Sequence, residues 1–209
     1  MITIIDYGVG NLFSLACSFK KIGEQVQITS DANTILSAER IVLPGVGAFE
    51  DAAKKLKNSG LDVIVKQKAA QGTPILGICL GMQMLFDKSY EFGEHDGLGL
   101  IPGAVRPISP LIGDLKTPQM GWNALIFSKD KPKHPIFKYV SEGDHVYFVH
   151  SYAAMDCEDS VSAQTEYGAL LTAAACRNNV CGTQFHPEKS GNTGLNILRA
   201  FAEFCPSNP

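Results

Sequence analysis

Cys79 is the residue whose sequence context most suggests a catalytic role, because it lies between glycines at positions 77 and 81. The apolar run Pro74 to Ile78 predicts a buried strand before it, and the residues from Leu80 onward have the composition of a helix. A tight strand-to-helix turn needs neighbours without side chains, and it exposes its central residue. Backbone N–H groups at a helix N-terminus favour negative charge on a sulfur or an oxyanion. The pattern predicts a nucleophile, although a structural cysteine in a tight turn gives the same spacing.

His186 and Glu188 are the candidates to activate this thiol. They follow an expected strand, Val180 to Phe185, and Pro187 stands between them. Because residues two apart in an extended segment point to the same side, we expect the imidazole and the carboxylate to face each other. A histidine oriented by a carboxylate is the proton acceptor of a nucleophile–base–orienter triad. Taken alone, however, a His-x-Glu sequence is also a common surface pair.

Other histidines are rivals for the role of base. His145 and His150 lie in one strand-like segment, and neither has a carboxylate two residues away on it. His95 has acidic neighbours on both sides, but adjacent residues of a strand point to opposite faces. His134 lies in a polar loop. We therefore expect His150 to line a pocket or to be packed rather than to take part in the chemistry.

Composition limits the classes of function. With 209 residues, 45% of them hydrophobic and 19% charged, the chain suits a single domain over residues 1–209. The net charge of −3 arises from scattered charges of both signs, which disfavours binding to nucleic acid or to an anionic membrane. The glycine pair Gly8 and Gly10 lacks the third glycine of a dinucleotide fingerprint and the acidic residue after the next strand, which disfavours a nucleotide cofactor.

The cysteines and the first residues indicate a reducing compartment. The six cysteines are widely spaced and include no Cys-x-x-Cys pair, so we expect reduced thiols and neither a metal site nor a disulfide framework. Met1 leads directly into the apolar run Ile2 to Ile5, without a basic segment or a span of about twenty apolar residues. We therefore expect a cytoplasmic protein.

Strands and helices alternate in the first part of the chain. Expected strands are Ile2 to Ile5, Gln25 to Thr29, Arg40 to Leu43 and the run before Cys79; expected helices are Leu12 to Ile22, a short one capped by Ser30 or Asp31, Phe49 to Leu56 and Leu61 to Gln71. This alternation predicts an α/β fold with a mostly parallel, flavodoxin-like sheet flanked by helices. It also predicts a site at the carboxyl ends of the strands.

Glycines and prolines become frequent after Phe86, which predicts a different architecture for the second half of the chain. Expected strands there are Gly103 to Ile108, Trp122 to Phe127, Val146 to Val149, Val161 to Thr165, Ala169 to Cys176 and Val180 to Phe185. They predict an antiparallel extension beside the parallel sheet. A final helix, Leu195 to Phe204, has one apolar side that suits packing against the sheet.

Taken together, the motifs resemble a known family. Gly77-Ile78-Cys79-Leu80-Gly81-Met82-Gln83, followed by His186-Pro187-Glu188, is similar in order and spacing to the class I (triad) glutamine amidotransferases. Further segments resemble the branch of that family that serves histidine biosynthesis: 5–12, 43–49, 118–123, 149–152 and 186–190. The resemblance extends from Ile2 to the last helix, and the pairing of both motifs is more specific than either motif alone.

The resemblance implies a glutaminase. Cys79 would attack the carboxamide of L-glutamine, His186 would be the base and Glu188 would orient it. By position, the oxyanion would be held by the backbone N–H of Leu80 and by one N–H of the turn that contains Val46 and Gly47. Residues that would hold the glutamine are Gln83, Ser151 and Tyr152. No cofactor and no metal are implied.

The same resemblance implies a partner. In that branch the glutaminase forms a heterodimer with a (β/α)₈-barrel cyclase, which receives the ammonia through an internal path. The docking face would include Asn11, Met120, Trp122 and Lys189. Two other readings use the same triad: a glutaminase subunit that serves another acceptor, and a stand-alone γ-glutamyl hydrolase. A silent binding module of this fold would lack the nucleophile or the base, and this chain has both.

Overall fold

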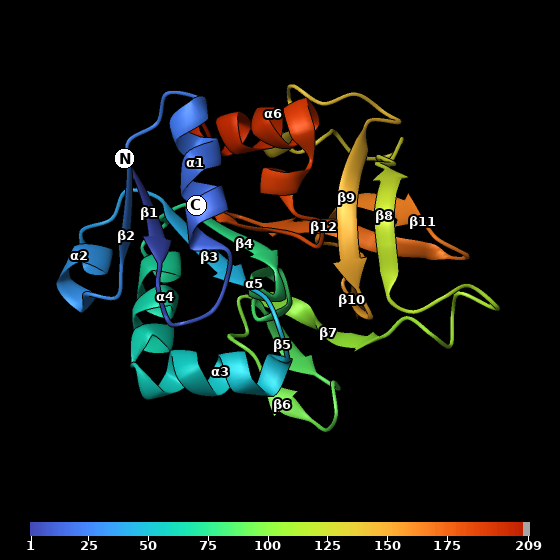
Figure 1. Ribbon diagram of the computed structural model, residues 1–209, viewed down its shortest axis with the longest axis horizontal. Helices are drawn as coiled ribbons and strands as arrows, with labels where there is room; N and C mark the ends of the chain where they lie inside the picture. Colours follow the sequence, from blue (N-terminus) through green and yellow to red (C-terminus); the bar gives the residue numbers. More distant parts are fainter. Residues whose placement is uncertain (207–209) are drawn as a thin grey trace.

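A seven-stranded sheet forms the centre of the computed structural model, which describes residues 1–206 (Figure 1). The strands, in their order across the sheet, are β11 (Val161–Glu166), β12 (Leu170–Arg177), β13 (Val180–Thr183), β4 (Ile75–Cys79), β3 (Ile41–Gly45), β1 (Ile2–Ile5) and β2 (Val26–Thr29). From β13 to β2 each strand is parallel to its neighbour. The β11–β12 and β12–β13 pairs are antiparallel. The expected mostly parallel sheet with an antiparallel extension is confirmed.

Helices cover both faces of this sheet (Figure 1). One face carries α1 (Leu12–Lys21) and α6 (Gly191–Ala202); the other carries α2 (Ala32–Leu36), α3 (Phe49–Asn58) and α4 (Leu61–Ala70). Because successive side chains of a strand point to opposite faces, Ile4 packs in the core beneath α1 and α6, and Ile5 packs in the core beneath α3 and α4. Burial on both faces explains the unbroken apolar runs of the parallel strands.

Two helix caps follow the sequence. The side chain of Asn11 accepts a hydrogen bond from the N–H of Ser14 at 3.4 Å and begins α1. Of the two candidates for α2, Asp31 is the cap, and it accepts from the N–H of Thr34 at 2.8 Å. These caps fix where the loops after β1 and β2 turn into helix.

The second half of the chain adds two smaller sheets. One is ordered β10-β7-β5-β6, from β10 (Tyr152–Met155), β7 (Ile101–Pro107), β5 (Phe86–Ser89) and β6 (His95–Asp96); the other pairs β8 (Gln119–Ala124) with β9 (His145–His150). We expected a strand from Trp122 to Phe127, but β8 begins and ends earlier. The reason is that the segment after Ala124 no longer pairs with β9, and Ile126 instead forms a bridge to Gln164 of β11. The segment therefore crosses from one sheet to another.

The helix predicted after Cys79 is much shorter than its composition suggested. It is the single turn α5 (Leu80–Gln83), and Phe86 already belongs to β5. The carbonyls of Met84 and Leu85 accept hydrogen bonds from the N–H groups of Leu98 and Ile101, at 2.8 and 3.0 Å. In a longer helix these carbonyls would accept from residues further along it. Tertiary pairing therefore overrides the helical propensity of this segment.

None of the helices within residues 1–206 has the length and apolar character needed to span a lipid bilayer.

We expect Gly81→Ala to destabilise the fold severely. A Cβ atom at Gly81 would overlap the carbonyl oxygen of Leu43, which is backbone and cannot move aside cheaply. The loss in free energy of unfolding should reach about 4 kcal/mol or more. Gly143 is the matched control, since it has φ +85° and open space around it; Gly143→Ala should cost about 1–2 kcal/mol, from backbone strain alone. Urea unfolding followed by circular dichroism measures both, and equal losses would contradict the close approach.

Candidate active site

Cys79 ends β4 and begins the turn into α5. Its backbone angles, φ 53° and ψ −111°, lie in a region that residues other than glycine rarely adopt. The flanking glycines let the backbone pass close by, because a Cβ atom at Gly77 would lie 2.7 Å from the carbonyl oxygen of Gly81. The strained turn holds the thiol at the carboxyl edge of the parallel sheet, where it borders a cavity. Local structure here matches a nucleophile elbow.

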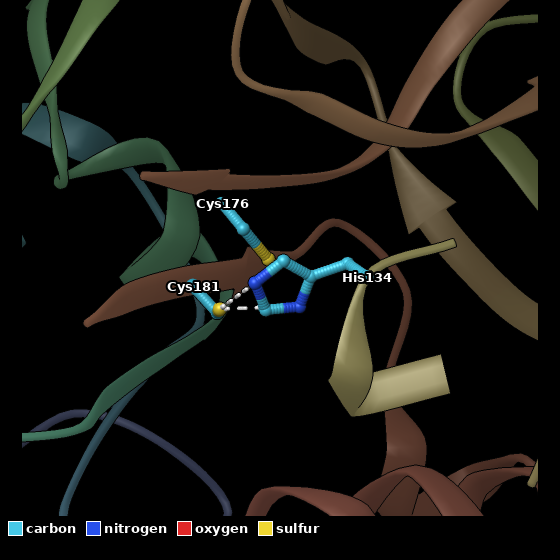
Figure 2. Close-up of side chains that lie close together, drawn as sticks. All are labelled: His134, Cys176 and Cys181. Carbon is cyan, nitrogen blue, oxygen red and sulfur yellow. Dashed lines mark hydrogen bonds between the residues drawn. The ribbon is translucent and has the colours of Figure 1, made fainter. Parts of the chain in front are cut away.

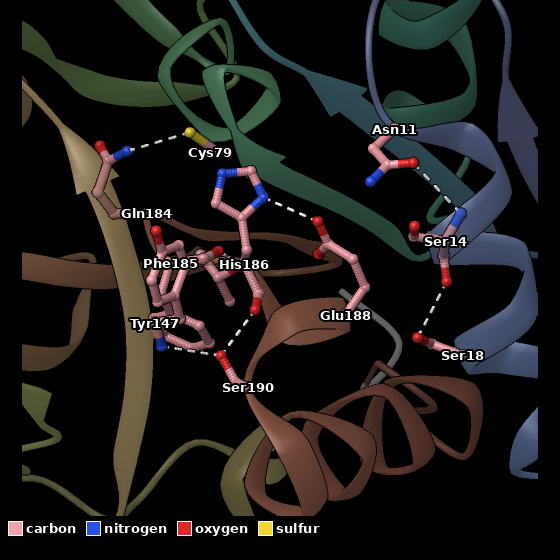
Figure 3. A network of polar contacts seen from close by, with 11 residues as sticks. Asn11, Ser14, Ser18, Cys79, Tyr147, Gln184, Phe185, His186, Glu188 and Ser190 are labelled. Atoms are coloured by element: carbon pink, nitrogen blue, oxygen red, sulfur yellow. Dashed lines mark hydrogen bonds and ion pairs between the residues drawn. The ribbon is translucent and has the colours of Figure 1, made fainter. Parts of the chain in front are cut away.

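The structure brings His186 and Glu188 to this thiol (Figure 3). Strand β13 runs parallel to β4 and leads the chain to His186. Nδ1 of His186 lies 2.8 Å from Oε1 of Glu188, and the other side of the ring faces Cys79. We expected an extended segment to align the pair, and this reason is wrong. β13 ends at Thr183, and the residues Pro187–Lys189 form a 3₁₀ turn, η2, across which the two side chains meet.

The backbone of His186 is held by β9. Its N–H donates to the carbonyl of Tyr147 at 3.0 Å. The hydroxyl of Ser190 donates to the carbonyl of His186 at 2.6 Å and accepts from the N–H of Tyr147 at 3.0 Å (Figure 3). Because these bonds tie the backbone of His186 to β9, they fix the position from which its imidazole projects. The sequence did not indicate this function of Ser190.

The charges around His186 favour its protonated form. Burial alone would lower the pKa of His186, but hydrogen bonds to Cys79 and Glu188 raise it to about 9. The side chains of His186 and Glu188 are each only 4% exposed. Within residues 1–206, Oε2 of Glu188 is buried without a hydrogen-bond partner. The imidazole is thus the group that balances the buried carboxylate, and the carboxylate in turn stabilises a proton on the ring.

A chain of buried amides also reaches the sulfur, and the sequence did not reveal it. Nε2 of Gln184 donates to Sγ of Cys79 at 3.8 Å, and Oε1 of Gln184 accepts from Nε2 of Gln83 at 3.0 Å. Nε2 of Gln83 also donates to the carbonyl of Tyr152 at 3.0 Å. Gln83, expected to hold a substrate, therefore uses both amide hydrogens within the protein. The only sequence signal for Gln184 was an amide side chain two residues before His186.

An open cavity of about 350 Å³ borders the thiol. Its lining residues are Val46, Gly47, Cys79, Leu80, Gln83, Glu91, Pro118, Val149, His150, Ser151, Tyr152 and His186. Every residue expected to hold the oxyanion or the glutamine is among them. The structure adds Glu91, whose carboxylate accepts from the N–H of Phe49 at 2.6 Å. The volume falls in the range of about 300–1,000 Å³ that is typical of small-molecule sites.

The turn after β3 is tight at one end and free at the other. Gly45 pairs with Cys79 in the β3–β4 ladder, and a Cβ atom at Gly45 would lie 2.6 Å from the N atom of Gly81. By contrast, Val46 is 43% exposed, and Gly47 has φ +95° with open space around it. The peptide units around Val46 are therefore only loosely confined at the cavity wall.

The loop after β1 packs on this turn. The hydroxyl of Tyr7 donates to the carbonyl of Pro44 at 2.6 Å. A Cβ atom at Gly10 would lie 2.9 Å from Cβ of Pro44, so the loop approaches the turn closely. The same residue, Pro44, thus joins the loop to the turn that borders Cys79.

His150 also lines the cavity but is unsuited to act as the base. Nδ1 of His150 lies 2.8 Å from the carbonyl oxygen of Tyr152, and Nε2 lies 2.9 Å from Oε1 of Gln119. Burial lowers the pKa of His150 to about 4, so the ring is neutral at neutral pH and gains a proton with difficulty. A thiol proton is more readily accepted by His186.

The residues expected at a partner interface lie in two places. Met120 and Trp122 are 63% and 53% exposed on one face of β8. The ring of Trp122 packs edge-on against that of Tyr147, with 6.1 Å between the ring centres. The ammonium of Lys189 lies 5.8 Å from the centre of the Tyr147 ring. These residues share one surface. Asn11 instead borders a cavity of about 10 Å³ beside Val46, His186 and Glu188.

Two further features lie away from Cys79. A cleft of about 400 Å³ lies beside α3 and α4 and includes His95, but its charges have both signs and no cysteine, serine or threonine lines it. His134, Cys176 and Cys181 form a cluster whose nitrogen and sulfur atoms lie within 4.8 Å of one another (Figure 2). The spacing of these residues along the chain predicted no such group.

Comparison with known proteins gives a consistent result. The family glutamine amidotransferase class-I matches residues 3–203. The imidazole glycerol phosphate synthase subunit HisH of Lactococcus lactis subsp. lactis is 47% identical over 203 residues, which cover 97% of this chain and 98% of that protein. The subunit of the same name from Caldanaerobacter subterraneus subsp. tengcongensis is 48% identical over 204 residues, covering 97% and 98%.

Solved structures share the fold. A crystal structure of a glutamine amidotransferase has a TM-score of 0.75 at 16% identity and covers 97% of this chain and 98% of that one. PurLQS from Thermotoga maritima has a TM-score of 0.71 at 19% identity and covers 97% of both. This chain belongs to the class-I glutamine amidotransferase family. Within that family, HisH subunits of several bacteria match it over nearly their full length.

We expect Glu188→Gln to flatten the dependence of stability on pH. The pKa of His186, about 9, lies above its ordinary value of 6.5. Protonated His186 therefore stabilises the fold fully below pH 6.5, and this contribution is lost as the pH rises through 9. Without the carboxylate the pKa moves down, and the loss across this window should shrink by on the order of 1–2 kcal/mol.

Urea unfolding at several pH values between about 6 and 9.5 measures this change. The matched control is Glu203→Gln, since Glu203 is a surface carboxylate paired with Lys138 and titrates far below this window. It should leave the slope as in the wild type. A slope in Glu188→Gln as steep as in the wild type would show that the carboxylate does not hold the proton of His186.

Proposed function

We propose that this chain is the glutaminase subunit of an imidazole glycerol phosphate synthase, and that Cys79, His186 and Glu188 form its catalytic triad. It hydrolyses L-glutamine to glutamate and ammonia, and the ammonia serves a partner cyclase in histidine biosynthesis. One observation carries the proposal: the strained Cys79 turn and His186, whose Nδ1 lies 2.8 Å from Glu188, meet at one cavity. The HisH relatives support the choice of subunit.

The first half of the reaction forms a thioester. His186 takes the proton of Cys79, and the sulfur attacks the carboxamide carbon of glutamine, so that the C=O electron pair moves onto oxygen. The C–N bond then breaks, and His186 gives its proton to the leaving nitrogen, which departs as ammonia. Glu188 keeps the ring in position and stabilises its protonated form.

The second half frees the enzyme. Water attacks the thioester carbon while His186 accepts one of its protons, and a second oxyanion forms. When this oxyanion collapses, the C–S bond breaks, the sulfur regains a proton from His186, and glutamate leaves. Gln184 donates to the sulfur at 3.8 Å, so it supports negative charge there each time the sulfur carries it.

Both oxyanions form where backbone N–H groups can reach them. We assign this role to the N–H of Leu80 and to one N–H of the Val46–Gly47 turn, because these residues line the cavity beside the thiol. Glu91 supplies a negative charge at the cavity wall for the α-ammonium of glutamine. Ser151 and Tyr152 form the wall of the glutamine site.

Gln83 shares in the glutamine site, mainly by holding other residues. Its amide hydrogens hold Gln184 and the carbonyl of Tyr152, and its Oε1 remains for the substrate.

Ammonia must stay neutral and away from bulk water if an acceptor is to use it. The small cavity beside Asn11 shares Val46 and His186 with the glutamine site, and we assign the exit of ammonia to this side. A (β/α)₈-barrel cyclase would dock there in a cytoplasmic heterodimer. Its contacts would include Asn11 and the exposed surface formed by Met120, Trp122 and Lys189.

The triad is tested by a series of variants. Cys79→Ala and Cys79→Ser should abolish release of glutamate while circular dichroism stays unchanged, because the turn accepts a small residue but the reaction needs the sulfur. His186→Ala should lose about 10²–10⁴-fold in rate and Glu188→Gln less, since the first loses proton transfer and the second loses orientation. Cys157→Ser is the control cysteine outside the cavity and should keep activity. A larger defect in His150→Ala than in His186→Ala would refute the choice of base.

The subunit assignment is tested by the partner. The peptide units around Val46 have room to change orientation, so we expect the isolated chain to be a poor glutaminase that the cyclase activates by completing the oxyanion site. Each tenfold activation requires about 1.4 kcal/mol of differential stabilisation. Release of glutamate should be compared for the chain alone, with the cyclase, and with the cyclase and its substrate. Equal rates under all three conditions would contradict the proposed activation.

A further inference from the structure

We propose that Cys176 is a thiol that reacts with hydroperoxides and that Cys181 is its resolving partner, so that the two form a disulfide between β12 and β13 (Figure 2). Glutamine hydrolysis as described above uses neither residue. The pair lies toward the start of β13, whereas His186 follows the end of that strand. The inference is therefore independent of the proposed triad.

The register of the strands suits a disulfide. Cys176 and Cys181 are directly opposite each other in the antiparallel β12–β13 ladder. The N–H of Cys176 turns away from β13 and donates to the carbonyl of Ser160 at 2.8 Å, so this is a non-hydrogen-bonded pair. In such pairs the Cα atoms lie about 4.5 Å apart, which is within the range of about 4.4–6.8 Å that a disulfide spans.

His134 is placed to activate one of the sulfurs. The N–H of Ile136 donates to Nδ1 of His134 at 3.3 Å, which assigns the ring proton to Nε2. Nε2 lies 3.9 Å from Sγ of Cys181, on the side of the ring turned toward both sulfurs (Figure 2). The hydroxyl of Ser162 donates to Sγ of Cys176 at 3.5 Å. These donors converge on the sulfurs.

The two thiols differ in charge and in access. Although burial alone would raise the pKa of Cys176, hydrogen bonds from Cys181 and His134 lower it below its ordinary value, whereas burial and the neighbouring Cys176 raise the pKa of Cys181. Cys176 and His134 line a cavity of about 230 Å³, whereas Cys181 is fully buried. An accessible thiolate beside a protonated resolving thiol is the arrangement of peroxide-sensitive cysteines.

The chemistry balances with hydrogen peroxide as the oxidant. The Cys176 thiolate attacks one peroxide oxygen, the O–O bond breaks, and the hydroxide that leaves takes up a proton to become water. The Cys181 sulfur then attacks the sulfur of the Cys176 sulfenic acid, the S–O bond breaks, and the departing hydroxide leaves as water with the proton of Cys181. Two thiols lose two electrons, and one peroxide becomes two molecules of water.

Peptide mapping tests the disulfide directly. The chain is treated with hydrogen peroxide, free thiols are blocked, and trypsin cuts after Arg177, so that a disulfide joins peptide 139–177 to peptide 178–189. Because peptide 139–177 also contains Cys157, Cys157→Ser is the matched control and must keep the cross-link. We expect this cross-link to form before any oxidation of Cys17 or Cys205, which are exposed.

Variants separate the two roles. Cys181→Ser should leave Cys176 as a sulfenic acid that a 1,3-dione labels, with no cross-link. His134→Gln should slow oxidation of Cys176 by about tenfold at neutral pH, because the imidazole no longer favours the thiolate. Ser162→Ala, which removes only the hydroxyl, should slow it less. Circular dichroism checks that each variant is folded. If His134→Gln does not fold, Ser162→Ala still tests whether the donors around Cys176 speed its oxidation.

Several results would overturn the proposal. One is oxidation of Cys17 or Cys205 ahead of Cys176, and another is an unchanged rate in both His134→Gln and Ser162→Ala. A third is a stoichiometric metal in the untreated chain that must be removed by a chelator before Cys176 reacts. That result would show that the cluster binds metal instead.

Discussion

The close contact between the Cys79 turn and strand β3 is the constraint on which the site depends. Gly81 lies against the carbonyl of Leu43, and Gly45 lies against the backbone of Gly81, so the side-chain-free residues let two backbones touch. Because β4 lies between β3 and β13, this contact places the Pro44–Gly47 turn on one side of the sulfur and the segment that leads to His186 on the other. The order of strands therefore determines which groups can act on the substrate.

This frame divides the site into a rigid part and an adjustable part. His186 is tied to Tyr147 and Ser190 through backbone and hydroxyl bonds, and its buried partner Glu188 has no other hydrogen bond among residues 1–206. A proton acceptor needs such fixed geometry, since small displacements weaken proton transfer. The Val46–Gly47 turn has open space and contributes backbone N–H groups only. Any adjustment of activity is therefore easiest at the oxyanion, where a rotated peptide changes the stabilisation without moving the nucleophile or the base.

The sequence predicted the parts of this arrangement that local patterns encode, and it missed those that distant contacts create. Apolar runs and glycines predicted the parallel sheet and the position of Cys79 at its edge. The spacing of His186 and Glu188 predicted their pairing, but it assumed an extended chain where η2 lies. The short α5 followed from hydrogen bonds to residues about fifteen positions further on, which no window of local propensity includes. Gln184, Ser190 and the cluster at His134 likewise depend on neighbours that are remote in the chain.

The loop between β1 and α1 gives the adjustable turn a physical connection to the outside. Tyr7 donates to the carbonyl of Pro44, and Gly10 approaches the ring of Pro44, so the loop cannot shift without moving the residue that precedes Gly45. The loop ends in Asn11, which is exposed at the surface and also borders the small cavity beside His186 and Glu188. A partner that binds this loop therefore has a short route to the Val46 peptides, through a backbone carbonyl and a proline ring rather than through the catalytic side chains. The backbone on both sides of Pro44 is held against the Cys79 elbow, through the carbonyl of Leu43 and through Gly45, so the residues with room to adjust are Val46 and Gly47, which follow.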